Sequence, residues 1–387
     1  MTKIAVIGCG YWGPKHVRTC TSLSGCRVVA VDSDLNRLKL IREANPEVET
    51  ETSLERILVD LTIDAVIIAT PANTHFDLSR KCLQAGKHVL CEKPLCRSTT
   101  EAQELIEIAQ STNRILMVGH IFLFNPGIEE LRNLIHLGKL GDLRYLTAVR
   151  TNPGPVRSDV NVVYDLAAHD ISIFNWLLGT LPESVAAHGT SWLQPHVEDI
   201  AMIQLMYPGN CLANIEVSWM NPRKVRTITV VGSRRMARWD DLDLSAPVVV
   251  YDRGRASTES ESDFAEFLKI QAADGDSHAP KISASEPLRV QNMAFINAIA
   301  KGATVRSDGD SGLGVVAVLE AITESLRLGG VPVKLKTCLT EIVSEEPLSH
   351  VAVEHESDFS ECISRHENGA GTAGYSAGGP EAAGIRA

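Results

Sequence analysis

Residues 4–13 read IAVIGCGYWG, an apolar run that leads directly into the glycine motif G-x-G-x-x-G. A short, continuously apolar run is typical of a parallel strand that is covered on both faces. A second such run, residues 27–32, ends in the acid Asp32, 19 positions after Gly13. The glycine motif alone is a weak signal, because glycine is common. A strand, a glycine turn, a helix and a second strand ending in an acid together predict the first half of a dinucleotide-binding unit.

The residues of this unit have separate expected tasks. Gly8 permits the tight turn, Gly10 lets main-chain amides approach a pyrophosphate, and Gly13 lets the helix pack closely on the strand. The pyrophosphate then meets the unpaired N–H groups at the helix N-terminus. Asp32 would accept hydrogen bonds from ribose hydroxyls and repel a 2′-phosphate, and the next two residues supply no arginine. NAD is therefore favoured over NADP, the alternative being a glycine turn in some other α/β protein.

Short apolar runs alternate with helical patterns in the N-terminal part of the chain. Strands are expected at residues 3–8, 27–32, 65–70, 88–92 and 115–118, with the clearest helices at residues 35–44 and 98–110. Ser98 is the expected N-cap of the second helix. This alternation is the signature of a doubly wound, parallel α/β sheet. We therefore expect a Rossmann domain over residues 1–122.

From about residue 125 the pattern changes. Helices are expected at residues 126–137, 165–178, 288–300 and 312–328, and strands at residues 143–151, 200–207, 211–219 and 225–232. The last three strands follow one another without helices, which favours an α+β domain with an open, mostly antiparallel sheet over residues 123–338. Beyond that point the apolar pattern fades into Gly, Ala and Ser, so residues 339–387 are expected to be a disordered tail.

The bulk composition excludes several function classes. The 37 Lys and Arg against 48 Asp and Glu give a formal charge of −11, which opposes binding to nucleic acid and to anionic membranes. No apolar run approaches the roughly 20 residues that cross a bilayer. The nine cysteines include no C-x-x-C pair, which argues against a disulfide framework and against a metal site. A reducing, cytoplasmic setting is expected.

Two segments follow expected strands at the edge where ligands bind in parallel sheets. Thr70 and Pro71 follow the third strand, where a cofactor contact and an ordinary turn are about equally expected. Glu92, Lys93 and Pro94 follow the fourth strand. Lys93 at that edge would orient a substrate hydroxyl and stabilise the alkoxide that forms as hydride leaves. The alternative is a solvated surface lysine.

Asp165 and His169 are four residues apart in a helical pattern, which puts both on one helix face. A carboxylate beside an imidazole orients the ring and favours the imidazolium, and His169 becomes a candidate general base. A helix N-terminal acid with an unrelated histidine is an equally expected alternative. Arg157, Asp159 and Asn161 precede this helix in a loop rich in Pro and Gly, and such a cluster either binds a polyhydroxylated ligand or is simply solvated.

Four motifs of the chain resemble the Gfo/Idh/MocA oxidoreductase family, and the resemblance covers about residues 3–335. The motifs are G-C-G-Y-W-G-P, A-T-P-A-N-T-H, E-K-P-L and D-L-A-A-H-D-I. The resemblance implies an N-terminal Rossmann domain and a C-terminal domain whose open sheet commonly forms an oligomer interface, so a homo-dimer or tetramer is expected. The family's catalytic lysine corresponds to Lys93, and its Asp/His pair to Asp165 and His169. The implied cofactor contacts, beyond the glycines and Asp32, are Tyr11, Trp12, Thr70, Pro71, His75, Glu92 and Lys93.

Residues 10–16, 157–170 and 280–288 look like the branch that acts on UDP-N-acetylglucosamine and its uronic acid. Those enzymes oxidise the sugar 3-hydroxyl to a ketone. One departure is Ala168, where the branch is expected to have a proline that stiffens the first helical turn. The substrate contacts that this resemblance implies are Lys93, His120, Asn125, Arg157, Asn161 and His169.

An NAD-dependent sugar-nucleotide 3-dehydrogenase is the leading interpretation. A dehydrogenase or ketoreductase acting on a cyclitol, a free sugar or a nucleotide-deoxysugar keeps the fold and changes the substrate. A branch that uses NAD transiently to cleave glycosidic bonds also keeps the fold. A non-catalytic NAD-binding regulatory protein is the alternative from another class, and the presence of Lys93, Asp165 and His169 argues against it.

Overall fold

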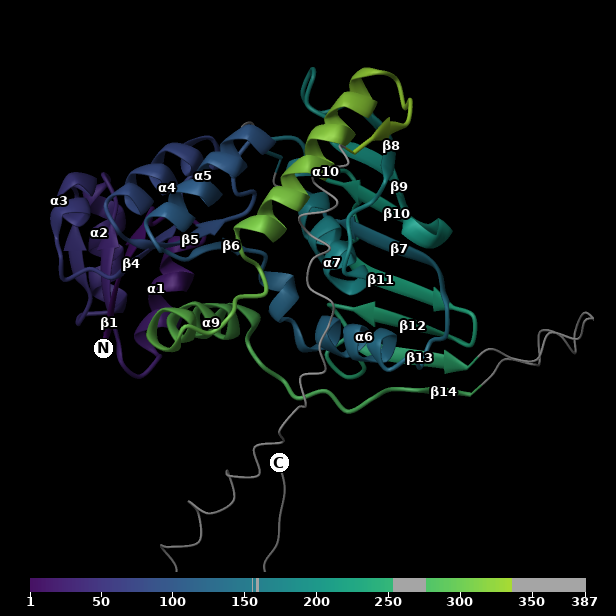
Figure 1. Ribbon diagram of the computed structural model, residues 1–387, viewed down its shortest axis with the longest axis horizontal. Helices are drawn as coiled ribbons and strands as arrows, with labels where there is room; N and C mark the ends of the chain where they lie inside the picture. Colours follow the sequence, from purple (N-terminus) through teal and green to yellow (C-terminus); the bar gives the residue numbers. More distant parts are fainter. Residues whose placement is uncertain (155, 158–159, 253–275, 336–387) are drawn as a thin grey trace, which may run out of the picture. The chain divides into compact units, whose positions relative to one another are not determined.

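The computed structural model describes residues 1–154, 156–157, 160–252 and 276–335, and Figure 1 shows its ribbon. Asp159, most of the polar segment at residues 257–285 and the expected tail at residues 339–387 lie outside the described residues. The described strands form two sheets, one of six strands and one of nine.

The first sheet is entirely parallel, with the strand order β3-β2-β1-β4-β5-β6. The order changes direction between β1 and β4, the point at which ligands bind in doubly wound sheets. The predicted Rossmann sheet is confirmed, but β3 was not predicted because its residues, Glu-Thr-Glu, carry no apolar pattern. The strands are β1 (Thr2–Ile7), β2 (Cys26–Val31), β3 (Glu49–Glu51), β4 (Ala65–Ile68), β5 (His88–Glu92) and β6 (Leu116–Gly119).

The strands of this sheet are apolar on both faces because both faces are covered. Alternate residues of β1 belong to two different apolar clusters. Ile4 and Val6 pack in one cluster, and Ala5 and Ile7 pack in the other. The expected N-cap is confirmed, since the Ser98 hydroxyl accepts a hydrogen bond from the Glu101 amide at 3.2 Å. The helices between the strands are α1 (Gly13–Thr21), α2 (Leu35–Ala44), α3 (Leu54–Val59), α4 (His75–Gln84) and α5 (Thr99–Ser111).

The second sheet has the order β14-β13-β12-β11-β7-β10-β9-β8-β15, and only its β7–β10 pair is parallel among the described strands. The predicted open, mostly antiparallel sheet is therefore confirmed. Its strands are β7 (Leu143–Thr151), β8 (Ser184–Thr190), β9 (Ile200–Tyr207), β10 (Cys211–Ser218), β11 (Val225–Gly232), β12 (Arg235–Asp240), β13 (Val248–Asp252), β14 (Ser277–His278) and β15 (Val333–Lys334).

Helices from the C-terminal half link the two sheets, as Figure 1 shows. α9 (Pro287–Lys301) packs against α1, and α10 (Gly309–Arg327) packs against α5, α7 and β8. α6 (Pro126–His136) packs against β12 and α7. Contacts on both sides of α10 hold the carboxyl edge of the first sheet close to the start of α7 (Ala168–Leu178).

Candidate functional site

The glycine loop between β1 and α1 is tight except at its middle glycine. Gly8 has φ +92°, and a β-carbon there would lie 2.7 Å from the Thr70 Cγ2. A β-carbon on Gly13 would lie 1.9 Å from the Gly8 carbonyl oxygen, whereas one on Gly10 would meet no atom within 4 Å. The chain's own packing thus requires Gly8 and Gly13, and Gly10 leaves open space that a ligand can approach. This loop fits a pyrophosphate at the N-terminus of α1.

Two aromatic side chains flank the glycine loop. The rings of Tyr11 and Trp12 contact each other edge to face, with centroids 5.6 Å apart. The Lys15 ammonium lies 3.3 Å from the Tyr11 ring centroid and lowers the pKa of the Tyr11 hydroxyl. Tyr11 is 76% exposed, so its ring is available to a ligand that lies along the loop.

Asp32, which directly follows β2, is tied to the glycine loop. Its Oδ2 accepts a hydrogen bond from the Cys9 amide at 2.7 Å, and its Oδ1 accepts one from the Asp34 amide at 2.9 Å. The Arg37 Nη1 also lies 3.4 Å from Oδ2. This arginine, in the first turn of α2, was missed because only the two residues after Asp32 were considered. A cavity of about 390 Å³ beside the loop is lined by Cys9, Gly10 and Arg37 among others.

Replacing Asp32 by alanine is expected to weaken NAD binding and to relax the discrimination against NADP. The carboxylate that repels a 2′-phosphate is lost, and Arg37 becomes able to pair with that phosphate. The ratio of the NADP to the NAD dissociation constant, measured by calorimetry, should fall by roughly tenfold or more. The double variant Asp32→Ala/Arg37→Ala is the matched control and should lose the gain in NADP affinity. An unchanged ratio in the single variant would contradict the role of Asp32.

Thr70, Pro71 and His75 build the turn after β4. The Thr70 hydroxyl lies 2.7 Å from the Thr74 hydroxyl, and Pro71 precedes a short 3₁₀ turn. The buried His75 ring lies with Nδ1 2.7 Å from the Pro94 carbonyl and Nε2 3.0 Å from the Thr70 carbonyl. His75 therefore lies between the turn after β4 and the turn after β5, and each of its ring nitrogens faces a main-chain carbonyl.

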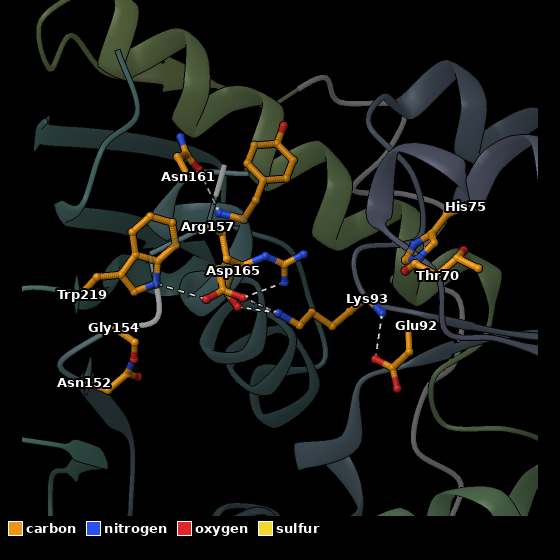
Figure 2. Close-up of polar contacts among 11 residues, drawn as sticks. Thr70, His75, Glu92, Lys93, Asn152, Gly154, Arg157, Asn161, Asp165 and Trp219 are labelled. Atoms are coloured by element: carbon orange, nitrogen blue, oxygen red, sulfur yellow. Dashed lines mark hydrogen bonds and ion pairs between the residues drawn. The ribbon is translucent and has the colours of Figure 1, made fainter. Parts of the chain in front are cut away.

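The Lys93 side chain runs from the end of β5 to Asp165, as Figure 2 shows. Its Nζ donates a hydrogen bond to the Asp165 main-chain carbonyl and lies 3.5 Å from the Asp165 Oδ1. Burial lowers the pKa of Lys93, and the Asp165 and Glu92 carboxylates oppose that shift. An ammonium that is buried, fixed and lowered in pKa is suited to stabilising or protonating a nearby oxygen.

Asp165 does not orient His169, contrary to the prediction. The two residues lie in a π-helical turn, Val163–Ala167, and in the α7 helix that follows it. The Asp165 carboxylate instead contacts Lys93, the Arg157 Nη1 at 3.2 Å and the Trp219 Nε1 at 3.1 Å (Figure 2). Three donors thus surround this carboxylate, and none of them is the imidazole.

His169 is oriented by an aromatic ring. Phe122 contacts it edge to face, with centroids 4.9 Å apart. The Arg150 guanidinium lies 4.3 Å from the Phe122 centroid and is fixed by a buried pair of hydrogen bonds to Asp170, at 2.7 and 2.8 Å. Burial lowers the pKa of His169 well below its usual value, and the Lys93 charge adds to the effect. Burial thus favours the neutral ring where the sequence predicted the imidazolium, and the neutral ring is the form that accepts a proton.

Several buried polar atoms at and near the His169 ring have no hydrogen-bond partner among the described residues. They include both ring nitrogens of His120, the Nδ1 of His169 and the Nε of Arg226. Burial, with the Lys93 charge, lowers the pKa of His120 to about 3. Because buried polar groups are normally paired, such a concentration marks a place where a polar ligand supplies the missing partners.

The other expected substrate residues are engaged within the chain. Arg157, on the loop before the π turn, pairs with Asp165, and Asn161 bonds to the Glu198 carboxylate at 2.8 Å and to the Tyr164 amide at 3.1 Å. Asn125 caps α6 by accepting a hydrogen bond from the Gly127 amide and donates to Asp241. Arg157 pairs with the cluster directly, whereas Asn161 and Asn125 each cap a local turn and also bond to a carboxylate distant in the sequence.

Neither a metal centre nor a membrane span emerges from the described part of the chain. No group of three or more His, Cys, Asp or Glu side chains in that part has the arrangement to hold a metal ion. None of its helices combines the length and the apolarity needed to cross a bilayer.

Trp219 and Phe122 are the site residues that sequence reasoning missed most plainly. Trp219 follows β10 and Phe122 lies in the 3₁₀ turn after β6 (Ile121–Phe124). An aromatic residue beside a strand end is ordinarily part of the core, so nothing in the sequence singles these two out.

Comparison with known proteins matches both parts of the chain. Residues 2–120 match the family model described as an oxidoreductase family with an NAD-binding Rossmann fold, and residues 128–238 match the GFO/IDH/MocA C-terminal domain. The UDP-N-acetylglucosamine 3-dehydrogenase of Acidithiobacillus ferrooxidans is 29% identical over 316 residues, covering 81% of this chain and 94% of that protein. A solved structure of that enzyme gives a TM-score of 0.72 at 28% identity and covers 84% of this chain and 98% of its own.

Two inositol dehydrogenases match a shorter segment. Inositol 2-dehydrogenase 2 of Saccharopolyspora erythraea is 31% identical over 223 residues, covering 56% of this chain and 66% of that protein. The scyllo-inositol 2-dehydrogenase (NAD(+)) of Bacillus subtilis is 30% identical over 233 residues, covering 57% of this chain and 68% of that protein. The chain therefore belongs to the Gfo/Idh/MocA family of NAD-binding oxidoreductases. This is shown by the two family models that it matches in chain order, by the shared fold and by these relatives.

Proposed function

We propose that this oxidoreductase oxidises a secondary hydroxyl of a sugar with NAD. The leading substrate is a UDP-N-acetyl-hexosamine or its uronate, oxidised at the 3-hydroxyl. The observation that carries the proposal is the buried group of Lys93, Asp165 and His169 beside the end of β5. It combines a fixed ammonium with a neutral imidazole. We assign cofactor binding to residues 1–122 and substrate binding to residues 123–338.

Oxidation of a carbinol needs one acceptor for the hydroxyl proton and another for the hydride on carbon. The nicotinamide, when bound, supplies the hydride acceptor. The neutral His169 takes the hydroxyl proton, and Lys93 donates a hydrogen bond to the same oxygen as negative charge develops on it. Asp165 fixes the Lys93 ammonium, and Trp219 with Arg157 fixes Asp165.

Identity over most of the chain supports the sugar nucleotide over a cyclitol. Similarity to the UDP-N-acetylglucosamine enzyme extends over 81% of the chain and so includes most of the proposed substrate domain. The two inositol enzymes described above are 31% and 30% identical but cover only 56% and 57% of the chain. Other inositol 2-dehydrogenases cover 84% to 86% of the chain, at a lower identity of 25% to 26% against 29% for the UDP-N-acetylglucosamine enzyme. A cyclitol is therefore the second candidate substrate.

Turnover on a substrate panel tests the proposal. The purified protein is incubated with NAD and a set of UDP-sugars, cyclitols and free sugars, and nicotinamide absorbance is followed, with 2-oxoglutarate added in parallel to recycle bound cofactor. Turnover with a UDP-N-acetyl-hexosamine or its uronate is expected. Turnover with a cyclitol alone would overturn the substrate assignment. Tight NAD binding without turnover on any compound would favour a regulatory protein, and a released aglycone without net reduction would favour glycosidic cleavage.

The pH profile of oxidation is expected to be broad. Because the pKa of His169 lies well below its ordinary value of 6.5, the base stays neutral and active as the pH falls through 6.5. Because the pKa of Lys93 is lowered from 10.5, the ammonium loses its proton, and activity falls, as the pH rises through a value below 10.5. A plot of kcat/KM against pH should thus place the acid limb below about 6.5 and the alkaline limb below about 10.5. An acid limb above 6.5 that vanishes in a His169 variant would contradict this expectation.

We further propose that the chain forms a homo-dimer or tetramer through the second sheet. Along β9, residues alternate between buried ones that face the helices and exposed ones such as Met202 and Gln204. An exposed sheet face with apolar side chains is a candidate interface. Light scattering should give a multiple of the 42.0 kDa chain mass. A monomer at micromolar concentration would contradict the proposal.

A further inference from the structure

A buried polar network lies next to the turn that carries Lys93, and the proposed reaction does not use it. His16, on α1, has no exposed surface, and its Nε2 lies 2.9 Å from the Glu92 Oε1. Its Nδ1 lies 3.1 Å from the Asn292 Oδ1, on α9. The network therefore joins α1, the end of β5 and α9 through side chains that are at least nine-tenths buried.

The donors and acceptors of this network favour one arrangement of its protons. The Thr19 hydroxyl has one proton, which it donates to the main-chain carbonyls of Lys15 and His16. It must therefore accept the hydrogen bond from the Asn292 Nδ2, at 2.6 Å. That orients the Asn292 amide with its oxygen toward His16, so the His16 Nδ1 carries a proton. The other ring nitrogen faces a carboxylate oxygen, and one proton lies between them.

The second oxygen of Glu92 reaches the residue proposed to be catalytic. The Lys93 amide donates to the Glu92 Oε2 at 3.3 Å. The carboxylate also lies close to β6, since a β-carbon on Gly119 would approach both its carbon and its Oε2 to 3.1 Å. His16, the Lys93 amide and Gly119 thus confine the Glu92 carboxylate from three sides.

We propose that His16 and Glu92 are positioning residues that share one proton and hold the Lys93 turn in its reactive geometry. This inference rests on the proposed function of Lys93. A buried charged or proton-sharing pair contributes little net stability, because desolvation offsets its attraction, so its effect should be on geometry and on charge. Misplacement of a reacting group by about 1 Å costs roughly 10²-fold in rate, so even a small shift of this turn is measurable.

The pair also acts on the charge of Lys93. Three charged groups bear on the ammonium: Asp165 and Glu92 favour its charged form, and Arg157 opposes it. Burial opposes the charged form most strongly. His75 also faces Glu92 from α4 and feels its charge. Removing the Glu92 charge should therefore lower the pKa of Lys93 further and shift the alkaline limb of the pH profile to lower pH.

Two isosteric variants of His16 separate its contacts. His16→Gln keeps a donor at the position of Nε2, next to Glu92, and His16→Asn keeps one at the position of Nδ1, next to Asn292. We expect His16→Gln to retain most of the turnover and His16→Asn to lose about tenfold in kcat with little change in KM. Thermal melting of both variants shows whether the fold is kept. Equal turnover in the two variants would overturn the positioning role of the Glu92 contact.

Two further measurements complete the test. Nitrogen-15 spectra of the ligand-free chain should show a protonated Nδ1 on His16, and a bare Nδ1 would overturn the assigned network. In Glu92→Gln, the alkaline limb of kcat/KM should move to lower pH, and an unmoved limb would overturn the charge effect. If Lys93→Met keeps full activity, the proposed function fails. If Lys93 is essential but the His16 variants behave alike, only this inference fails.

Discussion

Replacing Lys93 by methionine is expected to lower kcat by roughly 10²-fold or more, the loss typical of a group that acts on the reacting oxygen. Methionine keeps the length and apolar stem of the side chain and removes only its charge and its donors. The Asp165 carboxylate keeps its contacts with Trp219 and Arg157, so the turn before α7 should stay in place. Steady-state kinetics with saturating NAD measures the effect. The dissociation constant for NAD should change much less.

A surface lysine provides the matched control. Lys39, on α2, is exposed and forms only a loose ion pair with Glu43, at 3.8 Å, so Lys39→Met should keep full activity. The residual activity of Lys93→Met gives a second readout. Because the Lys93 charge contributes to lowering the pKa of His169, its loss should move the acid limb of the pH profile to higher pH. Near-wild-type turnover in Lys93→Met would refute its assigned role.

The strands of the first sheet were predictable because burial on both faces leaves an uninterrupted apolar run. Residues 65–68 are all buried and read AVII, so their strand stands out in the sequence. The polar edge strand β3 carries no such run, and its strand partner in the described sheet is β2. Similarly, β14 and β15 are only two residues long each. They are strands because they pair with β13 and β8, and their own sequence shows no strand pattern.

The site was predictable in composition but not in contacts. Lys93, Asp165 and His169 carry chemistry that a spacing rule can find, and the structure brings the first two into contact. The spacing rule places Asp165 near His169 along the helix, but it does not tell that Lys93, Arg157 and Trp219 supply the contacts of the Asp165 carboxylate. Which partner orients a side chain depends on tertiary packing, so Phe122 and Trp219 could be identified only in three dimensions.

These contacts divide the acid–base work between two groups. Asp165 and Glu92 favour a proton on Lys93, and the resulting charge helps to remove the proton from His169 and from His120. In the proposed reaction, Lys93 acts as the cation and His169 as the base. Environments that push two neighbouring pKa values apart in this way are the pattern by which acid and base roles are assigned in other enzymes. The arrangement makes the two substitutions, of Lys93 and of His169, test different halves of the reaction.

Replacing His169 by alanine is expected to lower kcat by roughly 10²-fold or more, because the hydroxyl proton loses its acceptor. The ring lies in a buried space beside Phe122, so its removal leaves room for a small base. Added imidazole should therefore restore part of the activity, with a rate that rises with the concentration of neutral imidazole. The acid limb that belongs to His169 should be absent from the pH profile of the variant without rescue. NAD affinity should change little.

The control for this experiment is an exposed histidine. His278, on β14, is exposed, and His278→Ala should retain wild-type turnover with no response to imidazole. Rescue specific to His169→Ala identifies the ring as a proton acceptor, because a purely structural loss is not repaired by a free base. Near-wild-type turnover in His169→Ala would exclude it as the base. A large loss that imidazole leaves unchanged across a range of pH would instead assign His169 to substrate binding, with the proton passing to another group of the cluster.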